Sequence, residues 1–160
     1  MRGEGCMLVQ TKFFGEVEID DAKILDFPNG IIGFEDFKKF AIIYDIDDDK
    51  ETKISWLQSV EEATLALPVI DPMAIVNEYS PMIEDELLKP LGNSADEDLL
   101  CLLVMTVPSD MTKVTANMKA PVIINSKTNK GVQLIVDNAD YPVKFNVYES
   151  VQKMKKEAGE

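Results

Sequence analysis

Residues 99–136 constrain the fold more than any other part of the chain, because they read as three β-strands joined by short turns. Residues 99–107 are almost continuously apolar, which is typical of a strand buried on both faces, and the run is too short to cross a membrane. Residues 112–125 alternate at first and are then interrupted at Pro121, which has no N–H to donate. Residues 132–136 return as the third strand. The pattern predicts an antiparallel β-sheet.

Alternation within residues 112–118 also predicts which side chains face the core. The apolar side chains that should share the inner face are Val114, Ala116 and Met118. Elsewhere, apolar runs bounded by Gly, Pro, Asn or Asp predict further short strands. These cover residues 7–14, 16–19, 23–27, 41–44, 53–59, 65–70 and 141–148. About ten short strands in one chain favour a small barrel or a sandwich.

Helical signals are few. Three phenylalanines recur every third residue between Phe34 and Phe40, which predicts a short helical turn over one end of the sheet. Ser80 followed by Pro81 predicts a capped helix that runs to about Leu88. Residues 149–156 are expected to form a short helix or a frayed tail.

Composition limits the classes of partner. The 160 residues carry a net charge of −13, which disfavours direct binding to nucleic acid or to an anionic membrane and favours basic proteins. The polar start of the chain has no secretory pattern, and the two cysteines, Cys6 and Cys101, lie far apart. We therefore expect a reducing, cytoplasmic location.

The sequence lacks residues that several kinds of catalysis and ligand binding require. The chain has no histidine and no Gly-rich phosphate loop, so we expect no metal, no cofactor and no histidine-dependent catalysis. Residues 47–49 resemble a calcium loop only loosely, because the required glycine and final glutamate are missing. Two alternatives remain open at this point: an acidic protein-binding module, or a hydrolase that uses two of the 29 acidic residues.

Five stretches follow one another in a specific order and spacing. They are residues 13–17 (FFGEV), 27–35 (FPNGIIGFE), 56–59 (WLQS), 68–72 (PVIDP) and 117–125 (NMKAPVIIN). Together they resemble the flagellar assembly factors of the FliW family, over about residues 11–148. One departure is Ile32, where the family usually has proline in a Gly-Ile-Pro-Gly turn.

The resemblance implies a cytoplasmic protein without enzymatic activity. It implies an all-β, mainly antiparallel fold, a compact β-barrel-like single domain over residues 1–160 with one or two short helices. It also implies two competing partners: flagellin, bound before export, and the mRNA-binding translational repressor CsrA. We expect no direct contact with nucleic acid or membrane, and we expect a monomer.

Acidic and polar positions supply the candidate contacts with these partners. We expect the exposed 47–49 loop, one further aspartate and an outward polar face to bind them. The residues are Asp47, Asp48, Asp49, Asp71, Asn117 and Asn125.

Overall fold

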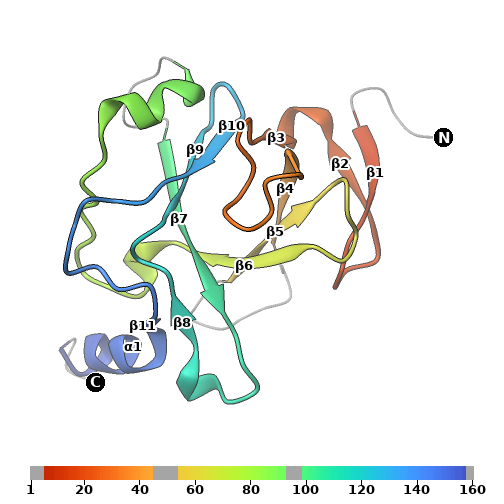
Figure 1. The fold of residues 1–160 in the computed structure, drawn as a ribbon. Coiled ribbons are helices and arrows are strands. Elements are labelled where there is room, and N and C mark those ends of the chain that lie inside the picture. Colours follow the sequence, from red (N-terminus) through yellow and green to blue (C-terminus); the bar gives the residue numbers. More distant parts are fainter. Residues whose placement is uncertain (1–5, 45–53, 93–98, 158–160) are drawn as a thin grey trace.

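The computed structural model describes residues 6–44, 54–92 and 99–157 (Figure 1). Its strands are β1 (Cys6–Gln10), β2 (Glu16–Asp20), β3 (Leu25–Asp26), β4 (Lys39–Tyr44), β5 (Ser55–Ser59), β6 (Ala66–Ile70), β7 (Leu99–Thr106), β8 (Thr115–Ala116), β9 (Val122–Asn125), β10 (Lys130–Gln133) and β11 (Phe145–Asn146). The short 3-10 helices are η1 (Asp21–Lys23), η2 (Pro72–Ala74), η3 (Asp85–Leu91) and η5 (Met111–Lys113), and α1 (Val147–Glu157) is an α-helix.

The main sheet closes on itself. Among the described strands, seven follow one another as β7, β6, β5, β4, β3, β10 and β9, and β9 pairs again with β7. The β3–β10 pair is parallel, and every other pair in this ring is antiparallel. Closure leaves no open edge in the ring. The prediction of a mainly antiparallel, barrel-like fold is confirmed.

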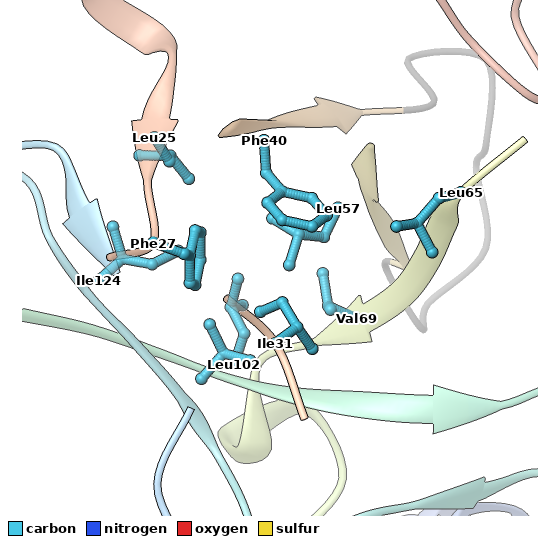
Figure 2. Close-up of a cluster of buried hydrophobic side chains, with 10 residues drawn as sticks. Leu25, Phe27, Ile31, Phe40, Leu57, Leu65, Val69, Leu102 and Ile124 are labelled. Atoms are coloured by element: carbon cyan, nitrogen blue, oxygen red, sulfur yellow. The ribbon is translucent and has the colours of Figure 1, made fainter. Parts of the chain in front are cut away.

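Alternating side chains of the ring fill the barrel interior. The cluster combines aliphatic residues with two aromatic rings, those of Phe27 and Phe40, which meet edge to face at 5.4 Å between centroids (Figure 2). Neither ring is exposed to solvent, and burial of such a side chain stabilises the fold by about 1.5–3 kcal/mol. Gly131 leaves room for Phe27, because a Cβ there would lie 2.4 Å from Cζ of the ring.

Three further pieces pack on the outside of the barrel. The β1–β2 hairpin forms its own two-stranded sheet and places Val9 and Ile19 against Ala41 and Ile43 of β4. The start of α1 packs against the β8 region through Val147. The end of η3 packs against β9 and β10 through Leu91. Each piece therefore contributes a core of its own outside the barrel.

The predicted helical turn at residues 34–40 is wrong. Residues 31–36 form turns, with an isolated bridge between Ile31 and Phe34, and Phe40 belongs to β4. The turns need Gly30 and Gly33, whose φ values of 70° and 90° are left-handed. The three-residue spacing of aromatic side chains thus reflects a compact loop that leads into a strand.

The predicted helix after Ser80 is also wrong at its start. Residues 79–84 are not helical, and the helix that follows is η3, whose N-cap residue is Glu84. The Ser80 N–H donates to the Tyr141 hydroxyl at 2.8 Å, and the Ser80 carbonyl accepts from Asn138. A tertiary hydrogen bond therefore uses the Ser80 carbonyl, which would otherwise accept the first bond of the predicted helix.

Strand ends differ from the expected ranges, while the buried faces agree. Val114, Ala116 and Met118 are all buried as predicted, but residues 111–113 form η5, so that β8 has only two residues. The expected strand over residues 141–148 shrinks to β11, after which α1 begins at Val147. Of the two alternatives expected for residues 149–156, a short helix or a frayed tail, the structure has the helix. Pro68 lies within β6 at a point where only β5 pairs with it.

Candidate partner-binding surface

Asp71 lies on the surface, where β6 ends and η2 begins. Its carboxylate Oδ1 accepts the Met73 N–H at 2.9 Å, which is the capping role expected of an aspartate before a proline-led turn. The side chain is exposed, so it also remains available to a partner. Burial raises the pKa of the nearby Cys101 thiol to about 12, and the negative charge of Asp71 adds to that shift.

Asn117 organises the connection between β8 and β9. Its Oδ1 accepts two backbone N–H groups, those of Lys119 and Ala120, each at 3.0 Å. These bonds fix the turn that brings Pro121 to the start of β9. The residue is half-buried, so some of its surface is open to solvent while Oδ1 holds the turn.

Asn125 is fully buried, and the prediction that it lies on an outward face is wrong. Its Nδ2 donates to the Leu91 carbonyl at 2.9 Å, which ties β9 to the end of η3. Its Oδ1 accepts the backbone N–H groups of Lys127 and Thr128 at 2.9 and 3.3 Å. A buried amide needs such partners, and the following turn supplies them.

The structure does not bring Asn117 and Asn125 together. The Asn117 N–H donates to the Val104 carbonyl near one end of β7, whereas Asn125 pairs with Leu99 at the other end. Five residues of strand separate those two points, or about 17 Å. Asp47, Asp48 and Asp49 lie outside the described residues.

A row of carboxylates on β2 was not among the predicted contacts. Glu16, Glu18 and Asp20 are all exposed on the outer face of the hairpin, while Val17 and Ile19 between them face the barrel. The signal was present in the sequence as an acidic residue at every second position of a predicted strand. This row, called the β2 carboxylate ladder below, is the most regular acidic feature of the described surface.

Other acidic side chains accept hydrogen bonds from the backbone and so stabilise turns. The Glu61 carboxylate accepts the N–H groups of Lys38 and Lys39 at 2.6 and 2.9 Å, and these bonds lower its pKa. The Asp110 carboxylate caps η5 by accepting from Thr112, which lowers its pKa in the same way. Such carboxylates stay ionised and contribute to the negative surface.

Neither cysteine has an activated thiol. The pKa of the Cys6 thiol is raised, first by burial and then by the charges of Glu18 and Asp20, so both thiols are protonated at neutral pH. Across residues 6–44, 54–92 and 99–157, no group of three or more Cys, Asp or Glu side chains is placed to hold a metal ion. Within the same ranges, no helix is long and apolar enough to cross a bilayer.

Comparison with known proteins agrees with this geometry. The FliW protein family model matches residues 8–147. The chain is 50% identical over 155 residues to the flagellar assembly factor FliW of Lachnoclostridium phytofermentans. The aligned residues make up 96% of this chain and 99% of the relative. It is 47% identical over 148 residues to that of Lachnospira eligens, covering 92% and 98% of the two chains.

A solved structure has the same fold. The crystal structure of a flagellar assembly factor FliW superimposes with a TM-score of 0.80 at 28% identity, and covers 89% of this chain and 97% of the other. The family match thus extends from the sequence to the closed barrel. This chain belongs to the FliW family of flagellar assembly factors.

Proposed function

We propose that this protein is a non-enzymatic, cytoplasmic binding factor for which two partners compete: flagellin, which it holds before export, and the translational repressor CsrA. Flagellin occupies the factor while flagellin accumulates. Export of flagellin frees the factor, which then takes CsrA off the flagellin mRNA and restores translation. The factor acts as a monomer with one partner at a time.

Family membership over residues 8–147 is the observation that carries this proposal. The charge of the chain supports it independently. A net charge of −13, with the exposed β2 carboxylate ladder as one of its parts, favours attraction to a basic RNA-binding protein. The two thiols, which are protonated at neutral pH, fit a role in binding better than one in nucleophilic catalysis.

The same charge supplies a mechanism for antagonism. When an acidic protein covers part of a basic repressor, its field repels RNA phosphates from the remaining surface. Long-range attraction raises the rate of encounter with the repressor and is screened by salt, whereas close packing sets the dissociation rate. Among the predicted contacts, Asp71 and Asn117 have exposed surface that a partner could touch, and Asn125 has none.

Calorimetry with purified partners tests the proposal. Flagellin monomer and CsrA should each bind the full-length protein with one-to-one stoichiometry, and each should displace the other. Fluorescently labelled flagellin mRNA should leave CsrA when the factor is added.

Three outcomes would contradict the proposal. No complex with either partner at tens of micromolar would favour an acidic module unrelated to flagella. Simultaneous binding of both partners would remove the competition. Turnover that is lost on replacement of a single carboxylate would favour the hydrolase.

A further inference from the structure

The outer strand of the hairpin, β1, is an open sheet edge. Within the described part of the chain, β1 hydrogen-bonds only to β2, and the two strands form a separate two-stranded sheet that packs on the barrel (Figure 1). The barrel has no comparable edge, because its seven strands form a closed ring. An open edge presents unpaired N–H and C=O groups to any extended chain that approaches it.

The register identifies those unpaired groups. The Thr11 N–H donates to the Gly15 carbonyl at 2.9 Å, so this facing pair is hydrogen-bonded. Pairs alternate along an antiparallel ladder, so Val9 and Met7 also exchange hydrogen bonds with β2. The N–H and C=O groups of Leu8 and Gln10 therefore point away from the hairpin.

The β1 edge has none of the usual protection against pairing. Sheet edges normally carry charged residues, prolines or bulges that prevent the addition of a strand. The sequence of β1 is Cys-Met-Leu-Val-Gln, without charge and without proline, and Leu8 leaves 51% of its surface exposed. The neighbouring β2, by contrast, carries a charge at every second residue.

The β2 carboxylate ladder lies on the same exposed face as Leu8. Its members stand directly opposite β1, with Glu16 facing Gln10, Glu18 facing Leu8 and Asp20 facing Cys6. Glu18 and Asp20 add to the burial that raises the pKa of the Cys6 thiol, so their charges act on β1 itself. A strand added beside β1 would enter this negative field.

We propose that β1 binds an extended segment of a partner protein as a third strand, and that this segment carries basic side chains at alternate positions. The added strand would lie about 4.8 Å from β1 and about 10 Å from β2, a span that a lysine and a glutamate side chain bridge together. Main-chain bonds to Leu8 and Gln10 supply affinity, and the ladder selects the charge. This inference concerns the mode of binding and does not depend on which protein supplies the strand.

A second copy of this chain is a poorer occupant of the same edge. Pairing of β1 with β1 of another copy would bring two carboxylate ladders onto one four-stranded ribbon. Each copy also carries a net charge of −13, so the two chains repel one another at long range.

Peptide binding to the full-length protein tests the proposal. The probe is an acetylated and amidated peptide of alternating lysine and valine, seven residues long. One control peptide has the same sequence with alternate backbone nitrogens methylated, which keeps the charge and removes the donors. We expect the probe to bind about tenfold more tightly than this control, and the amides of Leu8 and Gln10 to become protected from hydrogen exchange.

Variants locate the site. Leu8→Pro removes an N–H that the hairpin does not use. Leu8→Lys places a positive charge on the edge, which repels the lysines of the probe, and it serves if the proline variant does not fold. Each should weaken probe binding about fivefold or more. Ile135→Lys is the matched control, because it adds the same charge at a side chain that is 62% exposed outside the hairpin, and it should change affinity by less than about twofold.

Several results would overturn the inference. Equal binding of the methylated control would mean that only charge attracts the peptide. Exchange protection that appears elsewhere, or folded Leu8→Lys protein that binds the probe as the parent does, would remove β1 from the site. A dimer of the parent protein that Leu8→Lys dissociates would make a second copy the occupant.

Discussion

Replacement of Asn125 by alanine separates a structural role from a binding role at a position that the sequence analysis assigned to a partner. The change deletes the amide that donates to the Leu91 carbonyl and accepts from Lys127 and Thr128. The Leu91 carbonyl keeps a second donor, the Thr128 hydroxyl at 2.8 Å. The two backbone N–H groups of the turn lose this acceptor.

These losses set the expected magnitude. A hydrogen bond contributes about 0.5–1.5 kcal/mol net, and a buried donor left without an acceptor costs about 1–3 kcal/mol. The turn is only partly buried, so water will satisfy some of the freed groups. We expect Asn125→Ala to lower the free energy of unfolding by about 2–4 kcal/mol, a large fraction of the total of a small domain.

Urea denaturation followed by far-UV circular dichroism measures this change. The control is Asn77→Ala, which removes one exposed hydrogen bond to Glu157 and should cost less than about 0.5 kcal/mol. At a temperature where Asn125→Ala is folded, its affinity for flagellin and CsrA should equal that of the parent, because Asn125 has no exposed surface. A stability loss below about 1 kcal/mol, or a loss of affinity in the folded variant, would refute the structural role.

Three further perturbations test the packing, the charges and the pH dependence. Gly131→Ala should cost about 1–3 kcal/mol of stability in urea denaturation, because its Cβ would lie 2.4 Å from the Phe27 ring; adding Phe27→Leu should relieve part of that cost, and strictly additive losses would contradict the clash. Replacement of the three aspartates at residues 47–49 by asparagine should slow association with CsrA in stopped-flow measurements and make the association rate less dependent on salt, with little change in the dissociation rate. An unchanged association rate at low salt would contradict a role for residues 47–49 and make residues 96–98 the next candidate. Glu61 has a lowered pKa in the folded state, so its stabilising effect is complete above the ordinary value of 4.5 and is lost as the pH falls through the folded-state pKa; Glu61→Gln should therefore lose less stability than the parent on acidification, and equal acid losses in urea melts would argue against it.

Local periodicity predicted faces better than it predicted boundaries. Alternation in residues 112–118 placed the correct three side chains in the core, because which face is buried depends on spacing alone. It could not predict that residues 111–113 form a 3-10 turn, which the Asp110 carboxylate caps. The missed start of the helix near Ser80 has a similar cause, since Tyr141 and Asn138 lie about 60 residues away in sequence.

The candidate contacts were predictable only in part. Exposure of Asp71 follows from its position before a proline-led turn, which needs a capping carboxylate at the surface. Burial of Asn125 depends on η3, whose last carbonyls require a donor from β9, and nothing in the local sequence indicates that η3 lies there. The β2 carboxylate ladder was visible as a pattern, but its meaning depends on the open edge of β1, which only the topology reveals.

Ile32 shows how one departure from the family pattern fits into the rest of the chain. Proline at this position would have no N–H, whereas the Ile32 N–H donates to Oε1 of Gln133 at 3.0 Å. Nε2 of Gln133 donates in turn to the Ala120 carbonyl at 3.0 Å, so one side chain joins the 30–35 turn to the connection before β9. The shape of the turn depends instead on Gly30, where a Cβ would lie 2.6 Å from the Glu35 Cα. Isoleucine therefore keeps the shape of the turn and adds a hydrogen bond to Gln133. A relative with proline at this position would lack that hydrogen bond.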